Sequence, residues 1–435
     1  MEKIFFLGNV PANNSSKSGL IAALDLGTNK VACLIAKLEG SKDTDGNLIP
    51  KIVGFGHQMS QGLQSGSITD LDEAEMTIRS TVEAAEREAG ENIDNVIVNL
   101  GAPVLQSRLI SFDVSVAGHK VSELDLQRIF DPSTFDHGVS VNSELIHTIP
   151  VGYSIDGTRG IRDPRGMYGD RLGVNLHIMS AKKGPIKNLE TVISNCHLGI
   201  EKIVSSPFAS ALACLVEDEK QVGVTCIDIG AGTSGVSIFF DGELVFADII
   251  PIGGRNITRD IAKGIATSMA HAERLKVFFG NAIPSTNDDH EVIKVPLIGE
   301  SNDAEDIQIS RSMLIGIIRP RLEEIFEILR ERIKFAGFDK VAGRRAVLCG
   351  GGSQLPGLPE LMGKILDKQV RLGKPMYMDG LPEFARGPEF STCIGLLRYF
   401  NENKYKGFNN WKRITYYIWY WYDITGNKAF IIYRR

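Results

Sequence analysis

The chain has 435 residues, 43% of them hydrophobic and 23% charged, which is enough for two or three domains with cores of their own. The net charge of -5 excludes a surface built as a whole for nucleic acid, and six scattered cysteines without a C-x-x-C pair indicate buried thiols rather than disulfides or zinc ligands. No stretch reaches the roughly 18 consecutive apolar residues that a membrane span needs.

The N-terminal quarter reads as a leader followed by an α/β segment. Residues 1–18 are predicted to be a flexible leader, because their apolar run is too short for a signal peptide and Asn, Ser and Pro follow it. Residues 72–89 are predicted to form a helix, with Asp70 or Asp72 near its start and Gly90 just past its end. Buried strands are predicted at residues 20–26, 31–37 and 95–103.

The middle of the chain contains a unit of different character and then a repeat of the first strand pair. Residues 102–181 are rich in Gly, Pro and Asp with short alternating stretches, which predicts a small α+β unit inserted into the first domain. Residues 222–230 again form a buried strand that ends in an acid, a turn and a second strand. Asp25-Leu-Gly-Thr and Asp228-Ile-Gly-Ala-Gly-Thr therefore stand in corresponding places, and this repeat predicts two similar α/β halves.

The remaining elements are mostly helical. Residues 256–280 read as one or two helices, and residues 310–336 as a longer amphipathic helix that Pro320 is able to kink. Residues 344–358, RRAVLCGGGSQLPGL, read as a strand, a glycine turn and the start of a helix.

The first turn has the composition of a phosphate cradle. After the strand, Gly27 lets the backbone turn tightly, and the amides of residues 27–30 can converge on an anion. Asp25 would repel a phosphate unless a cation lay between them, and Mg²⁺ keeps most of its waters while it bridges carboxylate to phosphate. The nucleotide-binding residues predicted here are Asp25, Gly27, Thr28, Asn29 and Lys30.

A second turn offers the same cradle from the opposite half, and a third strand ends in glycines. One D-x-G-T alone is equally typical of an ordinary β-turn. Two copies after buried strands, together with GGGS after a third strand, favour a cleft that clamps a triphosphate, with Asp25 and Asp228 holding Mg²⁺ through its bound water. The residues predicted from these two turns are Asp228, Gly230, Gly232, Thr233, Ser234, Gly350, Gly351 and Gly352.

These three segments resemble the first phosphate, second phosphate and adenosine segments of the actin/Hsp70/sugar-kinase superfamily. Residues 152–172, 251–265, 272–276 and 347–361 further resemble FtsA, the family of actin-like bacterial cell-division proteins. The stretch 152–172 is the most specific, because chaperones and kinases have no such segment. The resemblance extends from about residue 19 to residue 400.

The resemblance implies the fold class: α/β, with two actin-like (ribonuclease H-like) halves around a nucleotide cleft and two inserted subdomains, 1C and 2B. The implied divisions are 19–101 and 182–205 for subdomain 1A, 102–181 for 1C, 206–245 and 308–400 for 2A, and 246–307 for 2B, with 1–18 as the leader and 401–435 as the tail.

The resemblance also implies a function. Members of the family bind ATP, polymerise on the inner face of the cytoplasmic membrane at midcell and anchor filaments of FtsZ, the bacterial tubulin. The implied partners are the FtsZ C-terminal tail on 2B, further copies of this chain, other division proteins on 1C and an anionic membrane surface, with no nucleic acid. In the superfamily the AERLK helix touches ribose and adenine, which points to Glu273 and Lys276; without the resemblance they are an acid and a base one helical turn apart.

One departure concerns hydrolysis. Superfamily hydrolases place Gln or Glu at the start of the connecting helix, where this chain has Ser206 before Pro207. A hydroxyl positions water less well and cannot act as a base near neutral pH, so we expect at most weak ATPase activity and a structural role. The alternative is an enzyme of the same superfamily, an ATPase or a small-molecule phosphotransferase, although we find no clear Asp base for a substrate hydroxyl.

The C-terminal tail is basic and aromatic. Residues 401–435 carry seven basic and two acidic side chains, a net +5, so the rest of the chain carries -10. Written as a helix, it places apolar and aromatic residues on one face beside basic ones, which favours an anionic membrane surface. The β-branched and aromatic content of the tail also suits a strand pair that turns within residues 424–429, where Gly-Asn is a hairpin signal. A strand pair or a disordered tail is therefore the alternative to the helix. The predicted membrane residues are Trp411, Lys412, Arg413, Ile414, Ile418, Trp419 and Trp421.

Overall fold

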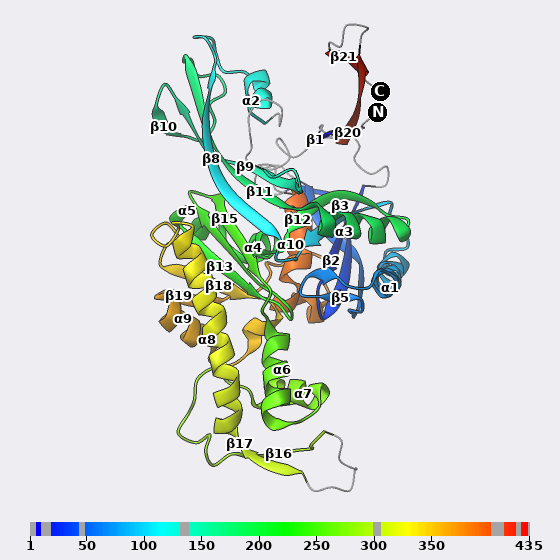
Figure 1. The fold of residues 1–435 in the computed structure, drawn as a ribbon, viewed down its shortest axis with the longest axis vertical. Coiled ribbons are helices and arrows are strands. Elements are labelled where there is room, and N and C mark those ends of the chain that lie inside the picture. Colours follow the sequence, from blue (N-terminus) through cyan, green and yellow to red (C-terminus); the bar gives the residue numbers. More distant parts are fainter. Residues whose placement is uncertain are drawn as a thin grey trace.

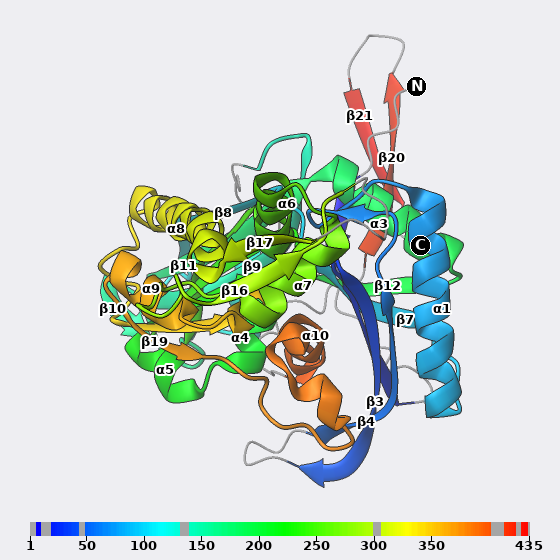
Figure 2. The same cartoon turned by 90° about the horizontal axis from the view of Figure 1, so that it is seen from below.

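The computed structural model of the protein describes residues 6–9, 19–42, 48–130, 139–298, 306–401, 413–422 and 428–433. Its centre consists of two five-stranded sheets, one in each half of the molecule, with two helices between them (Figures 1 and 2).

The first half is built on a sheet of order β12-β7-β2-β3-β4. The central strand β2 is buried along its whole length, as its sequence LIAALDL predicts for a strand covered on both faces. Helices α1 and α3 cover one face. The elements of this half are β2 (Leu20–Leu26), β3 (Lys30–Lys42), β4 (Leu48–Met59), β7 (Asn95–Leu100), β12 (Gly199–Ser205), α1 (Leu71–Ala89), α3 (Lys183–Asn195) and a short hairpin, β5 (Leu63–Gln64) with β6 (Ser67–Ile68).

Helix α1 has the ends that its sequence predicts. Asp70 is the N-cap, and its carboxylate accepts hydrogen bonds from the backbone N–H groups of Asp72 and Glu73. Gly90 ends the helix in the left-handed conformation, with φ of 71°, which glycine adopts without steric cost.

The second half repeats the first, with a sheet of order β15-β14-β13-β18-β19. In both halves an antiparallel strand–turn–strand unit is followed along the sheet by two parallel strands, so β2 corresponds to β13 and β7 to β18. The two similar α/β halves predicted from the repeat are confirmed. The elements are β13 (Val224–Ile229), β14 (Ser234–Phe240), β15 (Glu243–Ile250), β18 (Arg345–Cys349), β19 (Gln369–Leu372), α5 (Glu217–Val222), α8 (Arg311–Phe335), α9 (Leu358–Leu366) and the 3₁₀ turn η1 (Gly351–Gln354).

Two helices, α4 (Ser206–Cys214) and α10 (Ser391–Asn401), cross between the halves and form the largest core with both sheets. Figure 2 shows α10 between the blue strands of the first half and α4. A Cβ on Gly395 would lie 1.7 Å from the carbonyl oxygen of Ala209, so the two helix backbones touch at a point where only glycine fits. Two 3₁₀ turns, η2 (Glu383–Arg386) and η3 (Pro388–Phe390), precede α10.

Each half carries an inserted unit, and the two lie at opposite ends of the molecule in Figure 1. The first is a four-stranded antiparallel sheet of order β10-β9-β11-β8 with helix α2. Its base reaches the second half, because the backbone N–H of Ala247 in β15 donates to Ser107 Oγ in β8 at 3.2 Å. The unit consists of β8 (Leu105–Ser115), α2 (Glu123–Phe130), β9 (Ser143–Ile155), β10 (Thr158–Ile161) and β11 (Arg171–Lys182).

The second inserted unit packs α6 and α7 against the N-terminal turns of α8, beside a small hairpin. The sequence left open whether residues 256–280 form one helix or two; the chain forms two, because Ala266 turns into the left-handed region (φ 57°) and Ser268 caps the next helix. The elements are α6 (Gly254–Ile265), α7 (Met269–Phe279), β16 (Val292–Val295) and β17 (Ile307–Ser310).

The two ends of the chain pair with each other. Strand β1 (Phe6–Asn9) is antiparallel to β20 (Arg413–Tyr422), which is antiparallel to β21 (Lys428–Tyr433). The helix considered for the tail is therefore wrong over these residues, and the strand pair is what forms; a run of β-branched and aromatic residues favours extended backbone. The leader is likewise not wholly irregular, since β1 lies in it. Trp411 and Lys412 lie outside the described residues.

None of the helices in the described part of the chain combines the length and apolar character needed to cross a bilayer.

His147 in β9 ties the base of the first inserted unit to the two crossing helices. Its ring makes edge contacts with Phe208 of α4 and Tyr399 of α10, at centroid distances of 5.4 and 5.7 Å. Nε2 accepts a hydrogen bond from the backbone N–H of Ser205, and Nδ1 is buried without a partner among the described residues. Burial, with smaller contributions from Lys202 and His177, lowers the pKa of His147 from 6.5 to about 3.

This pKa predicts a loss of stability in mild acid. Unfolded His147 takes up a proton below pH 6.5 and folded His147 does not, so its contribution is complete above pH 6.5 and is lost as the pH falls toward 3. Between pH 7 and pH 5 we expect the free energy of unfolding to fall by about 2 kcal/mol more in the wild type than in His147→Gln, measured by urea denaturation. An equal fall in both proteins would contradict this assignment.

Candidate functional site

A cavity of about 620 Å³ lies between the two halves, where the turns after β2, β13 and β18 meet. Fourteen of the fifteen residues predicted to bind nucleotide line it. The exception is Ser234, the first residue of β14, whose buried hydroxyl donates instead to the carbonyl of Ile252 at 2.7 Å. The sequence therefore identified the residues around the cavity. Ser234 does not line it, because its hydroxyl holds the segment after β15 at Ile252.

The two predicted cradles have the same tight turn. The backbone N–H of Gly27 donates to the carbonyl of Lys30 at 3.0 Å, and that of Gly230 donates to the carbonyl of Thr233 at 2.9 Å. A Cβ on Gly27 would lie 2.7 Å from the carbonyl oxygen of Lys30, so the first turn closes this tightly only with glycine.

The turns also touch across the cleft. A Cβ on Gly232 would lie 2.4 Å from Oγ1 and 2.8 Å from Cγ2 of Thr28. The hydroxyl of Thr28 accepts a hydrogen bond from the backbone N–H of Gly66 at 3.2 Å, which leaves its own proton available to donate. Thr28 therefore lies at the meeting point of both halves and at the wall of the cavity.

Asp25 and Asp228 are the next-to-last residues of β2 and β13, so the repeat places both carboxyl groups at the mouth of the cleft. Burial raises the pKa of Asp25 to about 7; Lys30 opposes this shift and Asp228 adds to it. Burial likewise raises the pKa of Asp228, against the hydrogen bonds from Ser210 and Thr392 that lower it. Two buried acids whose charges act on each other would be stabilised by a cation nearby.

Lys30 supplies a positive charge beside both acids. Its Nζ donates to the carbonyl of Glu389 at 2.5 Å and lies 3.2 Å from the ring centroid of Phe390. Burial lowers the pKa of Lys30, while the negative charges of Asp25, Glu389 and Asp228 oppose that shift. The lysine side chain is thereby held by two residues of η3, the turn before α10.

The third turn lies against Asp228. Gly350 has φ of 82°, and a Cβ on it would meet Asp228 Oδ1. Glu273 and Lys276 form an ion pair with an Nζ–Oε2 distance of 2.7 Å, and both line the cavity, so their contact with a nucleoside stays a prediction. Thr258 of α6 joins them, since it accepts from Lys276 Nζ at 2.8 Å and donates to Glu273 Oε2 at 2.5 Å.

Ser206, the first residue of α4, lines the cavity as predicted. Its Oγ accepts a hydrogen bond from Asn99 Nδ2 at 3.1 Å, and Asn99 Oδ1 accepts from the backbone N–H of Leu26 at 2.7 Å. A chain of hydrogen bonds thus fixes the hydroxyl from β2 through β7. The residue at the start of α4 is therefore a serine, and not the Gln or Glu that positions water in hydrolases of the superfamily.

Sequence reasoning missed several residues of the site, and most give no local signal. Asn99 lies in a buried strand that is otherwise mostly apolar, and Ser210 and Thr392 lie in helices without a motif. Arg255 could have been found, since it directly follows the glycine pair of the segment PIGGRN.

The acids fit magnesium better than a metal caged by protein. Among the described residues, no group of three or more His, Cys, Asp or Glu side chains is placed to hold a metal ion. Mg²⁺ usually keeps several waters and uses one or two carboxylates together with phosphate oxygens. Asp25 and Asp228 provide that donor set, and the glycine turns leave the space beside them open.

Comparisons with known proteins place the chain among cell-division proteins. The family model described as cell division protein FtsA matches residues 225–395, and that of the SHS2 domain inserted in FtsA matches residues 104–180. Cell division protein FtsA of Rhizobium meliloti (strain 1021) is 41% identical over 391 residues, which cover 88% of each chain.

Two solved structures show the same fold. The chain matches one from the PilM–PilN type IV pilus biogenesis complex with a TM-score of 0.59 and 17% identity, over 86% of this chain and 97% of the other. It matches MreB5 of Spiroplasma citri, solved with ADP, with a TM-score of 0.52 and 16% identity, over 89% and 98%. The predicted fold class, with its actin-like halves, is confirmed.

The contact between the two turns makes a prediction. Gly232→Ala should weaken nucleotide binding about tenfold or more, because the new Cβ has no room beside Thr28 and the turns must separate at a cost of about 1–3 kcal/mol. Isothermal titration with Mg²⁺-ATP would measure it. Gly184→Ala in α3 is the matched control, since its Cβ meets nothing within 4 Å. Equal affinities in all three proteins would refute the contact's role.

Proposed function

This chain belongs to the FtsA family of actin-like cell-division proteins, and we propose that it binds ATP and Mg²⁺ between its halves, polymerises on the cytoplasmic face of the membrane at midcell and anchors FtsZ filaments there. The observation that carries the nucleotide part is the pair of acid-tipped turns, one from each half, that meet at Thr28 and Gly232. A nucleotide held there touches both halves at once.

Each part of the cavity has a role in this proposal. The backbone amides and hydroxyls of the two turns bind phosphate oxygens, Lys30 offsets their charge, and Gly350, Gly351 and Gly352 let the adenosine approach the backbone. Glu273 and Lys276 contact the nucleoside from α7. Bound Mg²⁺ would neutralise phosphate charge beside Asp25 and Asp228, which hold it through its waters.

We propose that hydrolysis is slow. An attacking water needs an acceptor near its proton, and the group at the start of α4 is the Ser206 hydroxyl, already hydrogen-bonded to Asn99. ATP then acts mainly by holding the halves together, which favours the polymer. Turnover comparable to that of a dedicated ATPase, or turnover stimulated by a small hydroxylated substrate, would favour the alternative of an enzyme.

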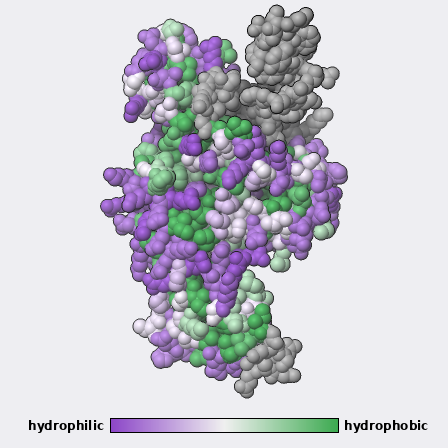
Figure 3. Space-filling model, viewed as in Figure 1, coloured by the Kyte–Doolittle hydropathy of each residue, from purple (hydrophilic) through white to green (hydrophobic). Residues whose placement is uncertain are grey.

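The subdomain division expected from the sequence is kept as part of the proposal, with 1C at residues 102–181 and 2B at residues 246–307. We assign the FtsZ tail to 2B and other division proteins to 1C. Figure 3 supports the first assignment, because apolar side chains gather on the face over α7 and β16. Exposed apolar residues of this unit are Val277, Phe278, Val292 and Ile298.

We propose that the tail carries the membrane contact. Seven basic side chains in residues 401–435 favour anionic lipid. Residues 413–422 and 428–433 form a strand pair. Any β-strand places successive side chains on opposite faces, so an aromatic membrane contact is compatible with a strand pair as well as with a helix.

The assembly proposal predicts the outcome of sedimentation. With ATP and anionic liposomes the full chain should pellet together with an FtsZ C-terminal peptide, and leaving out ATP or lipid should lower the pelleted fraction. A chain that ends at residue 403 should no longer pellet more with liposomes than without them, and it should still bind ATP. Phosphate release, followed in the same samples, should stay slow.

Two results would contradict the proposal. Lipid-dependent pelleting of the shortened chain would remove the membrane role of the tail. Failure of the full chain to pellet with ATP would remove the nucleotide-dependent polymer.

A further inference from the structure

Three cationic residues among those described line the cavity, and the side chains of two of them already have hydrogen-bond acceptors. Lys30 is bound to the Glu389 carbonyl beside Asp25 and Asp228, and Lys276 is paired with Glu273. Arg255, the third, has neither a hydrogen-bond partner nor a carboxylate partner among the described residues. Its guanidinium is thus the free cationic donor of the cavity in this structure.

Arg255 stands beside the second turn. It is the second residue of α6, and its backbone N–H donates to the carbonyl of Ala231 at 2.7 Å. The preceding N–H, from Gly254, donates to the carbonyl of Gly230 at 2.9 Å. These two bonds fix the start of α6 against the cradle, and Arg255, which is exposed, is among the residues that line the cavity.

Helix α6 has a cation in its first turn, as α8 does with Arg311. The first turn of a helix carries a partial positive charge and favours acidic side chains, yet the first turn of α6 has none and bears Arg255 instead. Two other arginines of the same region, Arg311 at the start of α8 and Arg321, are paired with carboxylates, whereas Arg255 and Arg259 of α6 have no such pair among the described residues. An anion in the cavity would be attracted by both the helix N-terminus and the guanidinium, which accounts for the arrangement.

The charges that line the cavity also favour an anion contact at Arg255. Four carboxyl groups line it, those of Asp25, Asp228, Glu273 and Glu389. A polyphosphate entering beside four acids gains from every cation that is not already neutralised. Lys276 is paired with Glu273, and the charge of Lys30 is shared with the buried acids beside it. Among the described lining residues, Arg255 is therefore the cation that no acid engages, and it adds to the positive charge that Lys30 offers a phosphate.

We propose that Arg255 binds phosphate oxygens of the nucleotide in this cleft. The guanidinium presents donors in a planar fork that matches phosphate geometry, in a way that a lysine ammonium does not. This assignment rests on the proposed nucleotide site and adds a residue from the start of α6. Arg255 thereby adds to the part of the nucleotide affinity that comes from the phosphates and leaves the part that comes from the nucleoside unchanged.

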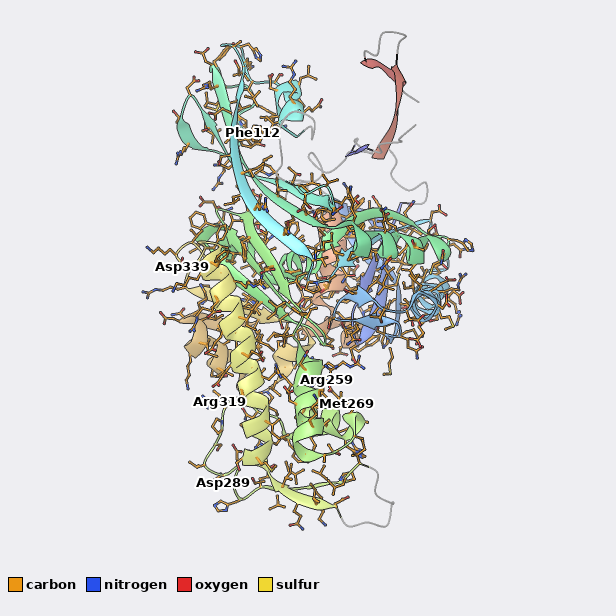
Figure 4. All side chains as sticks on the ribbon, viewed as in Figure 1. Phe112, Arg259, Met269, Asp289, Arg319 and Asp339 are labelled. Atoms are coloured by element: carbon orange, nitrogen blue, oxygen red, sulfur yellow. The ribbon has the colours of Figure 1, made fainter. Side chains whose placement is uncertain are left out.

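Arg259 offers a matched control. It lies on the same helix, one turn further along (Figure 4), and is exposed like Arg255. It is not among the residues that line the cavity. Replacing either arginine by alanine removes one positive charge from α6, so a difference between the two variants reports position rather than net charge.

Isothermal titration of the full chain with Mg²⁺-ATP and with adenosine tests the proposal. Arg255→Ala should bind Mg²⁺-ATP about tenfold more weakly or worse than the wild type, and Arg259→Ala should bind it within about twofold. Arg255→Lys should fall between, because it keeps the charge and loses the fork. Adenosine, which has no phosphate, should bind the wild type and Arg255→Ala equally.

The remaining outcomes overturn the assignment. An equal loss for Arg255→Ala and Arg259→Ala would mean that only net charge acts, and an equal loss for ATP and adenosine would place Arg255 on the nucleoside. Undiminished ATP binding by Arg255→Ala would remove the residue from the site while the proposed function stands. If the wild-type chain bound no nucleotide, both the proposed nucleotide site and the role of Arg255 would be wrong. The wild-type titration therefore distinguishes failure of the proposed function from failure of the Arg255 assignment alone.

Discussion

The contact between Thr28 and Gly232 is where the two halves of this protein meet across the cleft, and the geometry of the site depends on it. A bare Cα faces the threonine side chain there, so the turns approach as closely as backbone permits. That approach brings two buried carboxyl groups to one cavity, although each is the next-to-last residue of a strand in a different sheet. A repeated strand–turn–strand unit thus becomes one site when its two copies face each other.

The same acids connect the cavity to the crossing helices. Asp228 accepts hydrogen bonds from Ser210 of α4 and Thr392 of α10, and those helices touch at Gly395 and Ala209. Any rotation of one half against the other moves these helices, and with them the groups that orient Asp228. The pKa of both acids is raised by burial, so their ionised forms are held at a cost that a bound cation would relieve.

The site residues that could be predicted from the sequence are those that belong to a local motif. Asp25 and Asp228 were found because a buried strand that ends in an acid and a glycine turn is unusual, and two copies of it are more so. Asn99, Ser210 and Thr392 escaped because their roles arise only when strands and helices distant in sequence are packed together. The tail was ambiguous for a physical reason: its aromatic and β-branched residues suit an amphipathic helix and a strand pair alike, and the pairing with β1 comes from the other end of the chain.

The central claim is that two acid-tipped turns, one from each half, hold Mg²⁺-bound nucleotide. Calorimetric titration of Mg²⁺-ATP into the wild type, Asp25→Asn and Asp228→Asn tests it most directly. The account predicts that each substitution weakens binding at least about tenfold while the free energy of unfolding is kept or raised, because a buried carboxyl group is removed. Unchanged affinity in both variants would contradict it.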